Sequence, residues 1–438
     1  MKTIIQKLKN MYRRIKNKYV RYQYLRGKMG IKFFRKRDKR FVTSYDFDSG
    51  NLGYAYYEKG DYIRVKPRAT GYPFWWYGFS TDDLEGKTPI FRIQKSGYWQ
   101  WWKSIFKYAC YSTALDSDDW VSFDGTPTIG DTYAEIACKN PLPSGTLYFA
   151  HMPAYPLLRV TRKVTEWLKS PYVSDTSSGT NGIIGYATER DNIYDGRINP
   201  AQPFYALKIT NPVSKNIKNI AILTSGNHPG ETIARFLFEG TIDYLLGDTD
   251  EASILRDWFE FYVYPCVCPQ GVWGGYQRSC PDAPTLDHNR EWNSTGRIED
   301  IDAFKAAMMA DAGNAIHLGI DFHCSNSQAE NNYGIKLVAD GRSSVEAGAE
   351  TTFVNQMKTY PNNSNYYLDS SEDEGMLPHL WRTKHNVGNN IVICITTEIV
   401  NRLDVNVSDY LLNGEHIAKS IHKVLVDGHF PNYGNWKR

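Results

Sequence analysis

Two side chains that could bind a metal ion, His228 and Glu231, stand three residues apart in the sequence NHPGE. The apolar run 219–226 before them predicts a strand, and residues 231–246 predict a helix. The pair would therefore lie where a strand turns into a helix, and open α/β sheets place their ligand sites at the carboxyl ends of strands. A catalytic zinc takes three protein ligands of this kind and leaves one position open. The motif alone is weak, because a second copy spans 288–291.

Two further candidates each end an apolar run. His323 ends HLGIDFH, and Glu398 ends VICITTE. A buried strand that ends in a carboxylate needs a partner for that charge, which a metal-bound water would supply. Taken singly, His323 fits a hydrogen-bonded core histidine, and Glu398 fits a solvated strand end or an ion pair. Together the four placements favour a metal site over coincidence.

The segments around these residues predict an α/β fold in three parts. Residues 44–154 contain short β-type runs between Gly, Asp and Pro turns, which predicts an antiparallel β-sandwich. Residues 155–430 alternate strands with helical patterns, which predicts a mixed sheet with helices on both faces. Residues 1–43 form the third part, a basic amphipathic segment with apolar residues at helical spacing.

The net charge of +3 conceals an asymmetry between this segment and the rest of the chain. Residues 1–40 carry 16 Lys and Arg against one acid, Asp38, so the remaining chain is acidic, at −12. The helix could simply pack its apolar stripe on the body. It could equally contact an anionic membrane surface, RNA or an acidic protein.

Seven cysteines, an odd number, are scattered along the chain. Cys266 and Cys268 fall in the apolar run FYVYPCVCP, which predicts a buried strand. We expect reduced, mostly structural thiols and a cytoplasmic protein. No uncharged stretch reaches the 18 or so residues that span a bilayer, and no apolar signal core follows the basic N-terminus.

In order, NHPGE, LDHNR, DFH and TTE resemble the motifs of the zinc metallocarboxypeptidases. The sequence before these motifs is similar to that of the cytosolic carboxypeptidase branch, whose members carry an N-terminal β-sandwich. The similar segments are FDSGNLGYA, WYGFS, YSTALDSDDWVSF and LYFAHMPAYP, so the resemblance spans about residues 45–430. The best-known members of that branch trim glutamates from tubulin tails.

The resemblance implies one zinc ion per chain and a role for each of eight residues. His228, Glu231 and His323 would bind the zinc, Asp287 would orient His228, Glu398 would be the general base, Arg278 would stabilise the oxyanion, and Asn289 and Arg290 would hold the substrate's C-terminal carboxylate. A planar guanidinium holds a carboxylate with two hydrogen bonds, as a peptidase acting at chain ends requires.

The expected activity is hydrolysis of the C-terminal peptide bond of peptides or protein tails, with acidic residues among the candidates. The tubulin-trimming members have a basic run after the third zinc ligand, whereas this chain has CSNSQAENNYGIK, with Lys336 as its first basic residue. One alternative is a zinc amidohydrolase acting on N-acyl amino acids or peptidoglycan stem peptides, but such enzymes lack the N-terminal sandwich. Another is a non-catalytic binding module, which would be expected to have lost a ligand or the base.

Overall fold

The structure, a computed structural model, describes ten stretches of the chain. They are residues 43–58, 60–68, 76–94, 109–192, 196–325, 334–337, 343–361, 367–369, 375–400 and 406–433. The predicted basic helix therefore lies outside the described residues, as does most of the run that follows His323. Among the helices that are described, none is both long and apolar enough to cross a lipid bilayer.

The N-terminal part contains two sheets that face each other across one core. The first has the order β1 (Tyr54–Tyr57), β2 (Tyr62–Lys66), β4 (Ile90–Gln94), β8 (Tyr133–Ala137), β7 (Thr128–Ile129). The second has the order β3 (Gly78–Thr81), β9 (Leu147–Ala150), β5 (Cys110–Ser112), β6 (Val121–Ser122). Burial alternates along β2, β4 and β8, so each presents one face to the core.

Aromatic side chains from the two sheets meet in that core. Phe79 of β3 lies 5.8 Å, ring to ring, from Phe91 of β4 and 5.3 Å from Phe149 of β9. Strand pairing differs from the prediction at one place. Every described pair in these sheets is antiparallel except β2–β4, which is parallel. The five-stranded sheet is therefore mixed. Strand β3 lies between β2 and β4 in the sequence and belongs to the other sheet, so the chain crosses to that sheet and returns before β4 begins.

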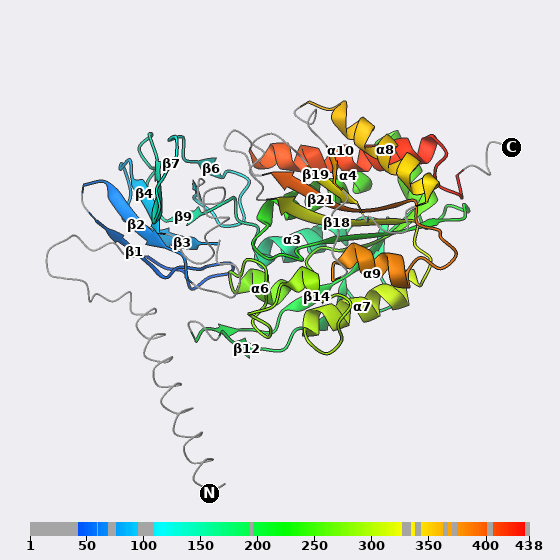
Figure 1. The fold of residues 1–438 in the computed structure, drawn as a ribbon, viewed down its shortest axis with the longest axis horizontal. Coiled ribbons are helices and arrows are strands. Elements are labelled where there is room, and N and C mark those ends of the chain that lie inside the picture. The colour runs from blue at the N-terminus through cyan, green and yellow to red at the C-terminus, as the bar shows by residue number, and fades with distance from the viewer. Residues whose placement is uncertain are drawn as a thin grey trace, which may run out of the picture.

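The body of the molecule is built on one eight-stranded mixed sheet (Figure 1). Its order is β10 (Val173–Asp175), β15 (Leu207–Ile209), β17 (Phe259–Tyr264), β16 (Asn219–Ser225), β18 (Leu318–Ser325), β21 (Ile393–Val400), β19 (Gly334–Leu337), β20 (Tyr367–Asp369). The four central strands, β17, β16, β18 and β21, are mutually parallel. Their carboxyl ends therefore meet at one edge, where a ligand site is expected.

Helices cover both faces of this sheet. In Figure 1, α4 (Thr232–Leu246), α8 (Ser344–Lys358) and α10 (Val407–Val426) lie on one side, and α7 (Glu299–Ala312) and α9 (Leu377–Lys384) lie on the other. Each side has its own apolar core cluster. The remaining described elements are α3 (Leu157–Trp167), α5 (Asp250–Trp258), α6 (Pro269–Trp273), the 3-10 turn η1 (His288–Arg290), and two small hairpin-like sheets, β11 (Ile183–Tyr186) with β14 (Pro203–Tyr205) and β12 (Arg190–Asp191) with β13 (Ile198–Asn199).

The predicted strand through FYVYPCVCP is wrong in its second half. Strand β17 ends at Tyr264, and Pro265 follows. Proline cannot donate a hydrogen bond to a sheet, so it stops the strand there. Cys268 instead becomes the residue that precedes α6, which begins with Pro269. This ending places Cys266 and Cys268 in a buried turn beside the carboxyl end of the sheet.

The sandwich contacts the body around α6. The Ser49 backbone N–H donates to the Trp273 carbonyl at 2.9 Å, and the Asn51 side chain donates to the Gly275 carbonyl at 3.2 Å. The buried Arg197 guanidinium donates to the carbonyls of Gly50 and Gly274, at 2.8 and 3.2 Å. These buried hydrogen bonds fix one orientation of the sandwich relative to the body. Any other orientation would leave buried donors and acceptors without partners, which would cost free energy.

Candidate metal centre

The turn between β16 and α4 carries the first two predicted ligands. Gly226, the first residue of the turn, has φ +72°, a backbone conformation that side-chain-bearing residues rarely adopt. A Cβ on Gly230 would clash with the side chain of Gln277. Both glycines are therefore needed for the chain to turn tightly enough that His228 and Glu231 point the same way.

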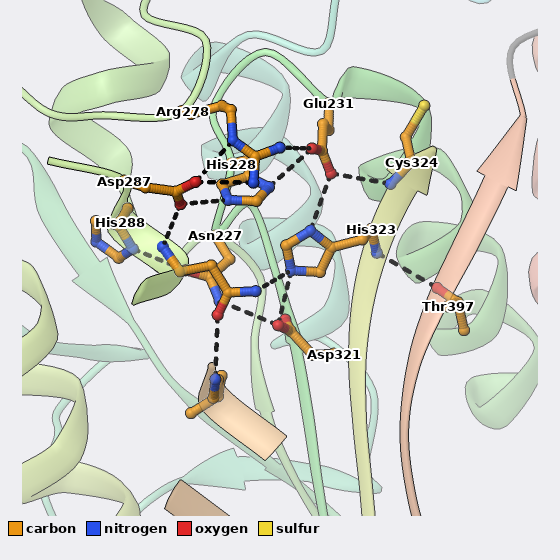
Figure 2. A network of polar contacts seen from close by, with 12 residues as sticks. Asn227, His228, Glu231, Arg278, Asp287, His288, Asp321, His323, Cys324 and Thr397 are labelled. Carbon is orange, nitrogen blue, oxygen red and sulfur yellow. Dashed lines mark hydrogen bonds and ion pairs between the residues drawn. The ribbon is translucent and has the colours of Figure 1, made fainter. Parts of the chain in front are cut away.

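The third predicted ligand reaches them from the adjacent parallel strand. One ligand atom from each of His228, Glu231 and His323 lies within 4.8 Å of the other two. His228 Nδ1 is 2.7 Å from Glu231 Oε1, and His323 Nδ1 is 2.9 Å from Glu231 Oε2. The three residues are 4%, 3% and 2% exposed, so this is an enclosed cluster and not a surface group (Figure 2).

Each imidazole is held from behind by a carboxylate. His228 Nε2 lies 2.9 Å from Asp287 Oδ1, and His323 Nε2 lies 2.7 Å from Asp321 Oδ2. Carboxylates in this position fix the tautomer and the ring orientation of metal-binding histidines. Figure 2 shows both pairs on the outer sides of the cluster, so the two Nδ1 atoms are left to face Glu231.

Sequence reasoning missed Asp321. It precedes His323 by two residues on β18, and residues two apart in a strand share a face. A carboxylate two residues before a predicted histidine ligand, on the same strand, could have identified Asp321 as the partner of that imidazole.

The charges in the cluster stabilise one another. Burial opposes ionisation of Glu231, but His228 and His323 outweigh it and hold the pKa of Glu231 well below its usual range. Burial also opposes the charge on His323, whereas Asp321 and Glu231 raise its pKa to about 10. The pKa of Asp287 is lowered against its own burial by His228 and Arg278. The cluster thus keeps Glu231 and Asp287 ionised, as the binding of a cation requires.

Arg278 lies beside this cluster. Its Nε donates to Asp287 Oδ2 at 2.9 Å, and Nη1 donates to Glu231 Oε1 at 3.3 Å. Burial opposes the charge on Arg278, and Asp287 and Glu231 outweigh it, so its pKa is raised. Its side chain is 18% exposed, which places a permanent cation at the rim of the cluster.

The turn η1 places Asn289 and Arg290 differently from each other. Asn289 is 1% exposed, and its amide contacts His323 Nε2 at 3.2 Å while its oxygen accepts from the Asn227 side chain at 2.8 Å. That oxygen also accepts from the Leu377 backbone at 3.1 Å. These contacts favour a positioning role for Asn289 over contact with substrate. Arg290 is only half-buried.

Glu398 lies on β21, directly opposite His323 of β18 in the parallel register. The neighbouring Thr397 hydroxyl accepts from the His323 backbone N–H at 3.3 Å, which ties the two strand ends together. Glu398 also lies close enough to Arg278 to raise its pKa. The predicted base therefore belongs to the same carboxyl edge as the three predicted ligands.

Residues 200–369 match the family model described as zinc carboxypeptidase. This part of the chain is therefore similar to zinc carboxypeptidases. The match includes His228, Glu231, His323 and the 278–290 segment, whereas Glu398 lies beyond its end. The predicted resemblance to the zinc carboxypeptidases is confirmed over residues 200–369.

Curated relatives match the chain over a short stretch. Cytosolic carboxypeptidase 3 of Mus musculus is 40% identical over 87 residues, which are 19% of this chain and 9% of that relative. Cytosolic carboxypeptidase 2 of Homo sapiens is 36% identical over 78 residues, which are 17% of this chain and 9% of that relative. The chain thus matches less than a tenth of the length of these relatives.

Solved structures match nearly the whole chain in fold. A metallo-carboxypeptidase from Burkholderia cenocepacia superposes with a TM-score of 0.70 at 16% identity, covering 88% of this chain and 99% of that one. A metallo-carboxypeptidase from Pseudomonas aeruginosa, solved in complex with (2-guanidinoethylmercapto)succinic acid, gives 0.69 at 16% identity with the same coverage. The predicted α/β fold is confirmed.

Proposed function

We propose that this chain is a zinc-dependent metallocarboxypeptidase that removes C-terminal residues from peptides or protein tails. The observation that carries the proposal is the enclosed His228–Glu231–His323 cluster with a carboxylate behind each imidazole. A cluster built only for stability would not need both histidines fixed with the same nitrogen inward.

The residues fit one zinc ion. Two imidazole nitrogens and a carboxylate are a donor set of catalytic zinc sites, and such sites keep one position open. The two Nδ1–Glu231 contacts, 2.7 and 2.9 Å long, lie in the directions that a shared cation would occupy. Zinc bound there would polarise the scissile carbonyl and lower the pKa of water.

Glu398 is the proposed general base. Its carboxylate, at the strand end opposite His323, would take a proton from the attacking water and deliver it to the leaving amine nitrogen. A carboxylate can serve twice in this way because each step restores the form needed for the next.

Arg278 is the proposed oxyanion stabiliser. It already lies against Glu231 and Asp287, so its cation is fixed before substrate binds, and fixed charges cost no reorganisation during the reaction. Arg290 is the proposed partner of the substrate's terminal carboxylate. Asn289, buried against His323, would position that imidazole and the backbone of η1 that carries Arg290.

The cellular location of the protein and the partner of its basic segment are also proposals. All seven cysteines are buried thiols outside any disulfide, which supports a reducing, cytoplasmic setting. The basic segment, residues 1–43, would contact an anionic surface: a membrane, RNA or an acidic protein. Deleting residues 1–42 should leave turnover of a short peptide unchanged while weakening salt-sensitive association with such surfaces. Loss of peptide turnover in that deletion would contradict the separation of the two parts.

The proposal is tested with zinc-loaded protein and peptides that differ only in their last residue, ending in Glu, Asp, Leu or Lys. Each peptide is paired with its C-terminally amidated form, and products are identified by mass spectrometry. We expect single C-terminal residues to be released, and we expect amidation and chelator each to prevent it. The preferred last residue follows from the same data.

Two results would refute the peptidase proposal. If amidated peptides are cleaved as fast as free ones, the enzyme does not recognise a terminal carboxylate. If no peptide is cleaved by protein that demonstrably holds zinc, the amidohydrolase alternative takes its place, and N-acyl amino acids and peptidoglycan stem peptides become the substrates to test. If the protein also turns over none of those, it is a binding module.

A further inference from the structure

A second group of potential metal ligands lies on the other side of η1 from the cluster described above. One ligand atom from each of Cys268, His288 and Asp300 lies within 4.8 Å of the other two. They come from three separate segments: the residue before α6, the start of η1, and the first turn of α7. Their exposed fractions are 0%, 0% and 2%.

Cys280 lies next to this group of three. The Cys268 thiol is 3.9 Å from the carbonyl oxygen of Ser279, the residue before Cys280, and both cysteines belong to one apolar core cluster. Cys280 is 0% exposed. Two thiols, an imidazole and a carboxylate from four segments are thus gathered in one buried volume. Zinc in structural sites takes four ligands of these kinds in a closed, tetrahedral arrangement.

The imidazole of His288 offers its free nitrogen to this group. Its Nδ1 lies 2.7 Å from Asn227 Oδ1, which also accepts from the Trp292 indole N–H at 3.1 Å. An indole N–H only donates, so this atom of Asn227 is the oxygen, and His288 Nδ1 must carry the hydrogen. His288 Nε2 is therefore left as a lone pair, the form in which imidazole binds a metal.

Two buried polar atoms in the group have no partner. They are His288 Nε2 and Asp300 Oδ2. An unpaired buried acceptor costs about 1–3 kcal/mol, so two in one place call for a common partner. The two atoms do not hydrogen-bond with each other in the structure. A cation shared by both would satisfy the two atoms.

We propose that Cys268, His288 and Asp300, joined by Cys280 when its thiol turns toward them, bind a second, structural zinc ion, held by two Sγ atoms, His288 Nε2 and a carboxylate oxygen. Thiolate ligands favour zinc over the hard cations magnesium and calcium. Burial raises the pKa of Asp300, so binding requires this carboxyl as well as both thiols to release their protons to solvent. The site stands apart from the proposed catalytic function, because none of its four residues belongs to the His228–Glu231–His323 cluster.

The proposed ion would act on the first cluster through the neighbours of His288 in the sequence. His288 lies between Asp287, which contacts His228, and Asn289, which contacts His323. An ion holding His288 to α6 and α7 would fix the turn from which both neighbours reach the first cluster. The same ion would tie the segment that contains Arg278, because the His288 backbone N–H donates to the Arg278 carbonyl at 2.9 Å.

The first test counts metal ions in the full-length protein loaded with Zn²⁺ and passed through a desalting column. Mass spectrometry of the elements should give two zinc ions per chain in the wild type. Cys268→Ala and Cys280→Ala should each give one. Cys266→Ala is the matched control, equally buried and two residues away, and should give two. One ion in the wild type, or two in both cluster variants, would overturn the proposal.

The second test uses Co²⁺ in place of Zn²⁺, and its deciding measurement is made on the wild-type protein. Thiolate bound to Co²⁺ gives an intense near-ultraviolet charge-transfer band, and the first cluster offers only nitrogen and oxygen ligands. Wild-type protein and His228→Gln should both show the band. Its absence from the wild type would refute the site. A band in His228→Gln together with one cobalt ion per chain would separate this inference from the proposed catalytic centre.

Discussion

Removing the carboxylate behind His228 tests whether the cluster is arranged for a metal. In Asp287→Ala, His228 Nε2 loses the acceptor 2.9 Å away that sets its tautomer and orientation. Loss of such an outer partner lowers metal affinity by about 10- to 100-fold, or about 1.4–2.7 kcal/mol. The backbone N–H of Asn289, which donates to the same oxygen at 3.0 Å, loses its partner too.

The size of the loss in metal affinity within that range depends on Arg278. Two of its contacts are with Asp287, and the third, 3.3 Å long, is with Glu231. Once Asp287 is gone, the guanidinium has only the carboxylate that the metal needs, so it competes for Glu231. We therefore expect about 100-fold weaker binding in Asp287→Ala. Asp287→Asn keeps an oxygen for His228 and loses the charge, so we expect about 10-fold.

Affinity is measured by titrating metal-free protein with Co²⁺ against a competing chelator. The visible bands of the sulfur-free site are followed separately from the thiolate band. Asp311→Asn is the control, because Asp311 accepts hydrogen bonds from Ser177 and Ser178 and contacts no residue of the cluster. Wild-type affinity in Asp287→Ala would refute the role of the carboxylate. Equal losses in both Asp287 variants would show that charge alone matters and orientation does not.

Three further predictions concern catalysis, packing and pH. Glu398→Gln should lower kcat by about 10²- to 10⁴-fold with metal content unchanged, whereas Glu166→Gln, an exposed control, should not; substantial residual turnover would remove Glu398 as the base. Gly414→Ala should lower the free energy of unfolding by about 3 kcal/mol in denaturant titration, because the new Cβ would clash with the α4 backbone, whereas Gly348→Ala meets nothing closer than 3.6 Å and should not destabilise. Burial, and secondarily Lys419, lower the pKa of His416 to about 4, so the unfolded chain takes up the proton first. The contribution of His416 to stability should therefore be complete above about pH 6.5, fall by about 1–2 kcal/mol between pH 6.5 and about 4, allowing for solvent screening, and change little below that. His416→Gln should flatten that dependence.

The positions of the first cluster could be predicted because each candidate ends an apolar run. A strand ends where its hydrophobic pattern stops, so His323 and Glu398 could be placed at carboxyl ends without knowing the order of strands. What the sequence could not supply was which strands are neighbours. The direct pairing of His323 with Glu398 depends on β18 and β21 being adjacent, although 74 residues separate their paired positions.

The second cluster could not be predicted for the same reason. Its four residues lie in four segments, and no two have the short spacing that marks a zinc motif. Cys268 was expected in a strand, where its thiol would have been one more apolar side chain. The proline that ends β17 instead turns it toward α6, and this local event creates a ligand from a core residue.

The contact between the sandwich and the body bears on the site through the segment after α6. Asn51 donates to the carbonyls of both Trp76 and Gly275, at 2.9 and 3.2 Å, so one buried amide joins the two parts. Gly275 has φ +67°, and a Cβ there would crowd the backbone of Gly50. Only two residues separate Gly275 from Arg278, and a chain that short cannot shift at one end without moving the other. The sandwich therefore helps to fix Arg278 against Glu231 and Asp287 while lying outside the cluster itself, which gives it a structural role in the proposed active site.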